Sequence, residues 1–223
     1  MTLSDKLQEF YFHLDPGRNL PPGFEIMNPF TNPYVRDLCT SFYNKYFSDN
    51  NKRSLLLGIN PGRFGAGVTG ITFTDPIRLE KECGIQNNYK KRLEISSVFI
   101  YDVIRSYGGP DRFYSKFLLS AVSPLGFMRK GKNVNYYDTR ELLYKLKPFI
   151  VSTLKQQVAI AGSNERVFCL GEGRNYWYLN KLNMELDLFG EIISLPHPRW
   201  IMQYRFRNKR DYVKEYLRKL ENV

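Results

Sequence analysis

The sequence contains few residues of the kinds that bind metals or form cross-links. Its 223 residues include three cysteines and two histidines. Cys39, Cys83 and Cys169 lie far apart and form no Cys-x-x-Cys pair, a spacing that excludes the common zinc and iron–sulfur motifs. A chain of this length can bury a sufficient core without disulfides. We therefore expect a reduced, intracellular protein that uses no metal and no cofactor.

Long apolar runs are also missing. No apolar stretch approaches the roughly 20 residues that span a bilayer, and the segment from Met1 to Phe10 lacks the basic start and apolar middle of a secretory signal. The mean hydropathy of −0.43, with 43% hydrophobic residues, excludes a membrane protein and an intrinsically disordered chain. We expect a soluble monomer with no membrane partner, cytoplasmic and nucleoid-associated if its source is bacterial.

Acidic residues are scarce relative to basic ones. The chain has 33 Lys and Arg against 22 Asp and Glu, which leaves a formal net charge of +11. Such an excess indicates a negatively charged partner, and nucleic acid is the usual one inside a cell. The charge alone suits any protein that binds single- or double-stranded DNA. The chemistry of particular loops must therefore decide the function.

Hydrophobic patterning predicts strands that alternate with helices. The continuously apolar runs, typical of strands covered on both faces, are 54–59, 117–122, 166–170 and 191–195. The segments with helical spacing of apolar residues are 1–15, 34–47, 94–107, 139–161, 172–186 and 208–220. A proline-rich stretch at about 16–33 is expected to form an irregular arm. This order predicts an α/β fold, a three-layer α/β/α sandwich with a central, mostly parallel four-stranded sheet, and a single domain over 1–223.

The densest functional signal follows the first predicted strand, where five glycines lie between Gly58 and Gly70. Ligands of parallel α/β sheets bind at the carboxyl ends of strands, although a poorly ordered surface loop is the plain alternative. Gly65 to Gly70 also match the G-x-G-x-x-G dinucleotide fingerprint. That match is weak, because Asn60-Pro-Gly-Arg-Phe separates it from the strand and no acidic residue follows at the ribose-binding distance. A P-loop is excluded because no Gly-Lys-Ser/Thr occurs.

Of the two histidines, His197 is the better candidate for chemistry. It directly follows the fourth predicted strand, and the proline on each side of it restricts the backbone that presents it. His13 lies in the opening helix, where a packed or solvated side chain is the ordinary role. A purely structural His197 at the strand end is the alternative. Because both loops follow strands of one sheet, we expect His197 and the glycine loop to face the same crevice.

Together the two loops resemble a known family. The motif Gly58-x-Asn-Pro-Gly-x-Phe-Gly, continued by Thr-Gly-x-x-Phe73, with His197-Pro near the carboxyl end, is similar to the single-strand-selective monofunctional (SMUG-type) branch of the uracil-DNA glycosylase superfamily. The Asn-Pro-Phe tripeptide at 28–30 resembles that branch as well, and the resemblance runs from about Phe24 onward. The missing cysteine cluster separates the sequence from the iron–sulfur branches.

The resemblance implies an enzyme of base excision repair that hydrolyses the N-glycosidic bond of a base flipped out of DNA. His197 would donate a hydrogen bond to the base oxygen where negative charge accumulates, Asn60 would orient the attacking water, and Phe73 would stack on the base. No lysine nucleophile is needed, so the enzyme would be monofunctional. The other residues that would border the base pocket on this resemblance are Gly62, Phe64 and Ala66.

Residues around and after His197 are expected to hold DNA. Eight basic and three acidic residues lie between Arg199 and Val223, and apolar side chains there would fill the gap left by a flipped base. A solvated amphipathic helix is the plain alternative. The residues expected to bind DNA are Arg63, Arg129, Lys130, Lys132, Arg199, Trp200, Ile201, Met202 and Arg205.

One position departs from the family. Where the family has an Asn that reads the Watson–Crick edge of uracil, this sequence has Ala121. Ser120 or Ser123 would supply a hydroxyl that both donates and accepts, which tolerates hypoxanthine or xanthine as well as uracil. We expect a DNA glycosylase for these bases. Two other functions stay open: a noncatalytic nucleic-acid-binding protein of the same fold, and a small-nucleotide-binding enzyme that uses the glycine loop.

Overall fold

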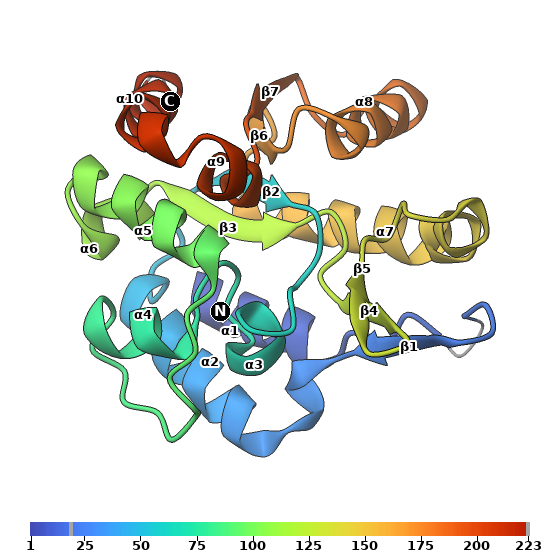
Figure 1. Ribbon diagram of the computed structural model, residues 1–223, viewed down its shortest axis with the longest axis horizontal. Helices are drawn as coiled ribbons and strands as arrows, with labels where there is room; N and C mark the ends of the chain where they lie inside the picture. The colour runs from blue at the N-terminus through green and yellow to red at the C-terminus, as the bar shows by residue number, and fades with distance from the viewer. Residues whose placement is uncertain (18–19, 222–223) are drawn as a thin grey trace.

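A four-stranded parallel sheet forms the centre of the protein. The computed structural model describes residues 1–17 and 20–221 (Figure 1). The sheet has the strand order β3-β2-β6-β7, and each neighbouring pair is parallel. Its strands are β2 (Ser54–Gly58), β3 (Phe117–Ala121), β6 (Arg166–Leu170) and β7 (Glu191–Leu195). The predicted α/β fold is confirmed, and the sheet is parallel in all its pairs.

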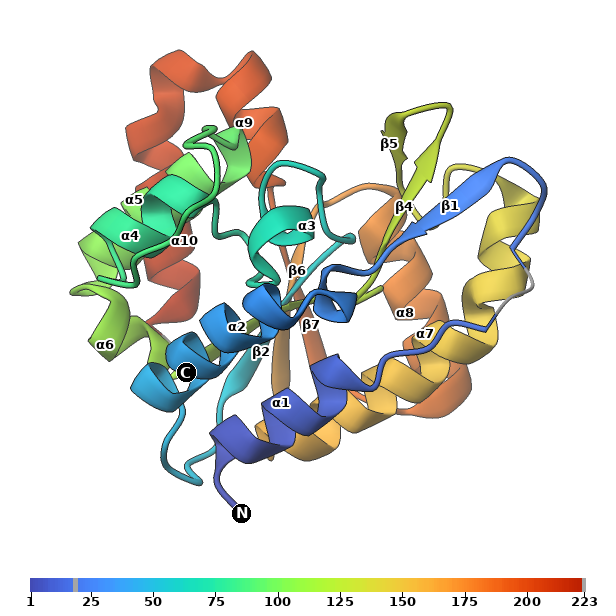
Figure 2. The same ribbon diagram turned by 90° about the horizontal axis from the view of Figure 1, so that it is seen from below.

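Helices cover both faces of this sheet. The α-helices are α1 (Leu3–Phe12), α2 (Pro33–Tyr46), α3 (Ala66–Thr69), α4 (Pro76–Lys81), α5 (Ile95–Tyr107), α6 (Pro110–Tyr114), α7 (Arg140–Ala161), α8 (Arg174–Leu186), α9 (Pro198–Tyr204) and α10 (Lys209–Leu220). Figure 2 shows α5 and α10 on one side of the sheet and α7 and α8 on the other. This two-sided cover explains why every residue of β2 and β3 is buried. No helix in the described part of the chain is long and apolar enough to cross a membrane.

Local capping signals place the ends of the longer helices. Asn32 accepts a hydrogen bond from the Tyr34 backbone N–H, and Pro33 occupies the first position of α2. The Thr139 side chain accepts from the Leu142 N–H at the start of α7, and Gly162, at φ 68°, ends that helix in the left-handed conformation. Because such signals are local, the helices predicted from the sequence match α2 and α7 closely at both ends.

A second, smaller sheet lies beside the first. Its strands are β1 (Phe24–Met27), β4 (Gly126–Arg129) and β5 (Lys132–Val134), paired antiparallel in the order β1-β4-β5. The prediction of an irregular arm is therefore wrong for β1 and for the 3-10 turn η1 (Pro29–Thr31). Arm positions 18 and 19 lie outside the described residues. The arm forms a strand because β1 pairs with β4, which lies about 100 residues further along the chain.

Met27 of β1 connects the small sheet to the glycine loop. A Cβ placed on Gly67 would lie 2.5 Å from the Met27 sulfur, and one placed on Gly126 would also overlap the Met27 side chain. A backbone carbonyl oxygen also lies close to each position, that of Gly62 at 2.9 Å from the Cβ placed on Gly67 and that of Pro61 at 2.7 Å from the Cβ placed on Gly126, so both positions require glycine. The arm holds the loop that follows β2 in place, and this fixes the position of the candidate site.

Candidate functional site

A cavity, called here the main cavity, opens at the carboxyl ends of the parallel strands. It measures about 520 Å³, and its walls include Asn60 after β2, Ala121 at the end of β3 and His197 after β7. The structure thus brings together the two loops that the sequence analysis expected to share a crevice. The position and size suit a small organic ligand at the carboxyl edge of an α/β sheet.

The side-chain amide of Asn60 is held in one orientation. Its Nδ2 donates to the Val134 carbonyl oxygen at 3.3 Å, and its Oδ1 accepts from the Tyr136 backbone N–H at 3.1 Å. Because a carbonyl oxygen only accepts and a backbone N–H only donates, these bonds determine which end of the amide is the oxygen. Oδ1 has a second lone pair for a ligand. An amide in this position can orient a water molecule, but it cannot serve as a general base.

A buried polar network supports Asn60 from behind. The Tyr136 hydroxyl donates to Asn175 Oδ1 at 2.7 Å. Asn175 is 1% exposed, and its Nδ2 lies 3.5 Å from the Gly58 carbonyl oxygen and 3.2 Å from the Cys169 sulfur. The network joins α8 and the end of β2 to the segment that bonds to Asn60. It therefore sets the position of the Asn60 amide relative to the sheet.

His197 presents a neutral imidazole with a known tautomer. Its Nδ1 accepts a hydrogen bond from the Arg199 backbone N–H at 3.1 Å. Burial of the ring, and secondarily the charge of Arg199, lower its pKa from 6.5 to about 4. A neutral ring whose Nδ1 accepts must carry its proton on Nε2. His197 therefore lines the main cavity as a neutral hydrogen-bond donor at neutral pH.

The backbone that carries His197 is rigid. Pro196 and Pro198 flank the histidine, and the buried Tyr216 hydroxyl of α10 donates to the Pro196 carbonyl oxygen. The Gly171 backbone N–H bonds to the Leu195 carbonyl oxygen at 2.7 Å, which joins the ends of β6 and β7. These contacts hold the Nε2–H donor without help from a ligand.

Phe73 forms an aromatic part of the cavity wall. Its backbone lies in the left-handed region at φ 54°, which is uncommon for a residue other than glycine. The ring lies so close to Gly58 that a Cβ there would be 2.9 Å from it, and the ring centre is 6.4 Å from that of His197. A strained residue at a cavity is typical of functional positions.

The remaining residues predicted to border a base divide into two groups. Those that line the main cavity are Gly62, Phe64, Ala66 and Ala121. Ser120 and Ser123 are buried away from it. The Ser120 hydroxyl bonds to the Tyr11 hydroxyl at 2.8 Å, and the Ser123 hydroxyl donates to the Leu125 carbonyl oxygen at 2.9 Å. Ser120 points away because successive side chains of a strand face opposite sides, so the expectation that either hydroxyl reads a base is corrected.

The residues predicted to bind DNA also divide. Those that line the main cavity are Arg63, Lys132, Arg199 and Trp200. Arg129 and Lys130 are exposed at the β4–β5 hairpin, and Arg205 lies over the Trp200 ring at 5.0 Å. Ile201 is fully buried and Met202 is partly buried against the core. Ile201 cannot contact DNA because α9 turns it inward, and this expectation is corrected.

Several cavity residues were not foreseen from the sequence; they are Thr72, Glu94, Ser96, Asn133, Asn135, Gln203 and Tyr204. Glu94 caps α5 by accepting from the Ser97 N–H at 2.9 Å. Within the described residues, the Ser96 side chain has no hydrogen-bond partner. Glu is not one of the usual N-cap residues, so no local signal marked this end of a loop, and only the fold places it at the carboxyl edge of the sheet.

The glycine loop serves close packing and does not form a dinucleotide site. Gly70, at φ 75°, lies where a Cβ would be 2.6 Å from the Cys39 sulfur. The helix that the loop opens, α3, is a single turn, too short for the dipole that binds a pyrophosphate. The partial match to the fingerprint therefore has a packing explanation.

No metal centre is formed by the described residues, since no cluster of three or more His, Cys, Asp or Glu side chains occurs among them. The three cysteines are buried and free. Burial raises the pKa of Cys169 to about 12, which leaves it as a neutral thiol rather than a nucleophile. The chemistry of the main cavity rests on Asn60, His197 and their neighbours.

Comparison with known proteins shows which family and which solved structure the chain resembles. The family model of the uracil DNA glycosylase superfamily matches residues 45–221. Among solved structures, the chain is similar to the crystal structure of wild-type Pedobacter heparinus SMUG2, with 42% sequence identity, a TM-score of 0.96 and full coverage of both chains. A comparison with functionally curated proteins finds no match.

We expect His197 to stay neutral well below the usual titration range of histidine. Since its pKa falls from 6.5 to about 4 on folding, the unfolded chain binds a proton first, and acidification through this interval should lower the free energy of unfolding by roughly 3 kcal/mol. NMR titration of the imidazole signals measures this, with His13→Gln used to assign the two histidine signals. A His197 signal that titrates at the ordinary value would contradict the lowered pKa and the burial that causes it.

The Tyr136–Asn175 bond should contribute to stability as a coupled pair. Tyr136→Phe or Asn175→Leu alone leaves one buried polar group unpaired and should lower the free energy of unfolding by about 1–3 kcal/mol, whereas the double variant should lose less than the sum. Urea unfolding measures the cycle, and Tyr144→Phe at an exposed position is the control. Strict additivity would show that the two side chains do not interact.

Proposed function

The chain belongs to the uracil DNA glycosylase superfamily, and from this membership we propose that it is a monofunctional enzyme for uracil and related deaminated bases flipped out of DNA. It is a DNA glycosylase, a hydrolase of N-glycosyl bonds that acts on DNA. The observation that carries the proposal is the neutral Nε2–H donor of His197 on the same cavity as the oriented amide of Asn60.

His197 stabilises the leaving base in this proposal. As the bond between C1′ and the base nitrogen breaks, its electron pair moves onto the base, and negative charge collects on a ring carbonyl oxygen. The Nε2–H group donates a hydrogen bond to that oxygen. A preorganised donor of this kind contributes about 3 to 4 kcal/mol in a site shielded from water. The low pKa of His197 keeps the ring neutral, so it stabilises the anion without transferring a proton.

Asn60 positions the water that completes the reaction. The departing base leaves a cationic sugar, and the oxygen of a water molecule bonds to C1′ while its proton passes to solvent. Asn60 Oδ1 accepts one hydrogen bond from Tyr136 at 3.1 Å and has a second lone pair for this water. Because the amide is held before the substrate arrives, little reorganisation is needed at the moment of attack. No lysine takes part, which leaves the DNA strand uncut.

Phe73 would contact the flipped base, and side chains of α9 would fill the gap that the base leaves in the DNA. The Phe73 ring offers a face for stacking beside His197. Trp200 is 38% exposed and Tyr204 66% exposed, and both line the main cavity. Since Ile201 is buried, these two aromatic side chains are the better candidates to enter the duplex. Arg63, Lys132 and Arg199 on the cavity wall would neutralise phosphates.

Base selection would depend on a small residue and on one free hydroxyl. Ala121 leaves space and no polar group at the end of β3, which fits hypoxanthine and xanthine as well as uracil. Asn133 and Asn135 are engaged with the backbone of Arg63 and with Asp138. The Ser96 hydroxyl, which can donate and accept, replaces Ser120 and Ser123 as the proposed reader of the base edge.

We further propose that the enzyme acts as a monomer and as one domain. The main cavity is built from one chain, with wall residues from Gly58 to Tyr204. A DNA substrate places its action with the chromosome, at the nucleoid if the source is bacterial.

Replacing Asn60 or His197 by Ala should strongly reduce excision. Loss of the His197 donor should slow the reaction about 100- to 1,000-fold, and Asn60→Ala should slow it by loss of the positioned water. Oligonucleotides with uracil, hypoxanthine or xanthine, single- and double-stranded, are incubated and cleaved with alkali to count abasic sites. His13→Ala and Asn50→Ala, both at exposed positions, are matched controls. Absence of abasic product from every substrate would refute the proposed function, and full activity of His197→Ala would refute its role.

Ala121→Asn should shift preference toward uracil. The new amide would bond to the uracil edge and restrict the space for purines, so the ratio of kcat/KM for uracil to that for hypoxanthine should rise about tenfold or more. Ala121→Leu, similar in size but apolar, separates the hydrogen bond from crowding. If Ala121→Asn leaves the ratio of kcat/KM values unchanged, position 121 does not determine which base is excised.

A further inference from the structure

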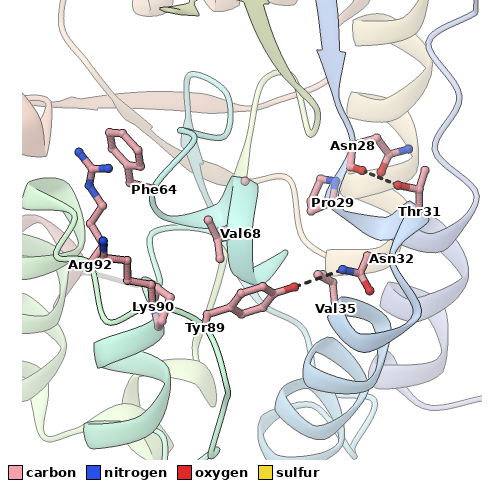
Figure 3. Close-up of a pocket in the computed structure, with 12 residues that line it drawn as sticks. Asn28, Pro29, Thr31, Asn32, Val35, Phe64, Val68, Tyr89, Lys90 and Arg92 are labelled. Carbon is pink, nitrogen blue, oxygen red and sulfur yellow. Dashed lines mark hydrogen bonds between the residues drawn. The ribbon is translucent and has the colours of Figure 1, made fainter. Parts of the chain in front are cut away.

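A second cavity lies on the other side of the segment that follows Arg63. It measures about 380 Å³ and is shown in Figure 3. Phe64 lines both cavities, Gly65 and Ala66 line the main cavity, and Gly67 and Val68 line the second. A single short segment therefore separates the proposed site of the flipped base from a neighbouring hollow.

The walls of the second cavity are mostly apolar and aromatic. Figure 3 shows Phe64 on one side, Tyr89 below Val68, and Pro29 toward the other side. The Tyr89 ring is supported by the Tyr34 ring, with centres 5.4 Å apart. Flat rings at an apolar hollow suit a planar ligand.

The amides around this cavity are already engaged. Asn28 Oδ1 accepts from the Phe30 backbone N–H, and Asn32 Oδ1 accepts from the Tyr34 N–H, both at 3.0 Å. Asn32 Nδ2 lies 3.4 Å from the Tyr89 hydroxyl. The cavity therefore offers stacking surfaces but few groups to distinguish one base from another.

Positively charged side chains lie at the edge of the second cavity. The Arg92 guanidinium lies 3.5 Å from the centre of the Phe64 ring, and that of Arg63 lies 4.5 Å from it. Lys91 is paired with Glu80. Over residues 1–17 and 20–221, by contrast, Lys90 and Arg92 form no ion pair with a carboxylate. Two unneutralised cations beside an aromatic hollow fit a ligand that combines a flat ring with a phosphate.

We propose that the second cavity binds a base of the same DNA strand that flanks the flipped base. That base stacks on Tyr89, and its phosphate lies on Lys90 and on Arg92, whose guanidinium covers Phe64. The inference rests on the proposed function, because the flipped base in the main cavity is what brings the strand to the shared wall. Flanking bases of a duplex are paired and stacked, so this site acts on single-stranded DNA, with little sequence preference.

The test moves a missing base along the strand. Single-stranded oligonucleotides with one uracil carry a tetrahydrofuran abasic analogue at each flanking position in turn, and kcat and KM are measured. For the unmodified protein, one position should raise KM about tenfold, the loss of one base–aromatic stack, with kcat unchanged. Val68→Trp, which fills the second cavity, should raise KM for the intact single strand by the same factor and then show no response to the analogue. KM for duplex substrates should not change.

Control variants and the contrary outcomes separate this inference from the proposed function. Arg112→Ala removes an exposed arginine that lies over the Tyr107 ring at 5.4 Å, and it should leave KM unchanged, whereas Arg92→Ala should raise it for single strands. Arg92→Ala carries the test if Val68→Trp fails to fold. Normal excision with a KM indifferent to every flanking base would overturn the second site alone. If no substrate is cleaved, fluorescence anisotropy measures the affinity of the variants for an undamaged single strand. Equal affinity of Arg92→Ala and Arg112→Ala would then overturn the second site. Weaker binding by Arg92→Ala would support it.

Discussion

The hydrogen bonds of the Asn60 amide are the constraint on which the rest of the site depends. They join the loop after β2 to the Val134 carbonyl and the Tyr136 N–H, at the end of the small sheet. The Tyr136 hydroxyl donates to Asn175, and the Asn175 amide in turn donates to the Gly58 carbonyl oxygen at the end of the large sheet. Two sheets that share no strand pairing are thus joined at the site itself. In a glycosylase, whose transition state separates charge between base and sugar, this rigidity keeps the polar groups oriented before the substrate enters.

The glycines of the glycine loop are explained by the close approach of other side chains to its backbone, and not by a need for flexibility. Gly58 makes room for the Phe73 ring and Gly67 for the Met27 sulfur. A glycine at either place allows contact at a distance that any side chain would prevent. Side chains from other parts of the chain occupy the space beside several of these glycines, among them Phe73 beside Gly58 and Cys39 beside Gly70. The same packing produces both the wall that separates the two cavities and the chance match to a dinucleotide fingerprint.

The large sheet was predictable from the sequence because its strands are short apolar runs, and two of them, β2 and β3, are buried along their whole length. β6 and β7 coincide with the predicted runs, and β2 and β3 each end one residue before the predicted end. The small sheet was not predictable, since Phe24 pairs with Arg129, and no local pattern reveals a partner so distant in sequence. The short helix α9 was not predicted for a related reason. The prolines on either side of His197 indicated a rigid loop, and the capping of α9 by the His197 side chain appears only in three dimensions.

For the site, the order of residues alone decided which chemical groups are present and where the backbone is restricted: the amide of Asn60 in a glycine loop, and the imidazole of His197 between prolines. The tertiary structure decided what those groups can do. The tautomer of His197 follows from the Arg199 N–H and its pKa from burial, while Ser120 faces the Tyr11 hydroxyl instead of the main cavity. The physical reason is that residue type and local backbone preference are properties of neighbours along the chain. Desolvation, side-chain direction and hydrogen-bond pairing are set by segments that meet only when the chain has folded.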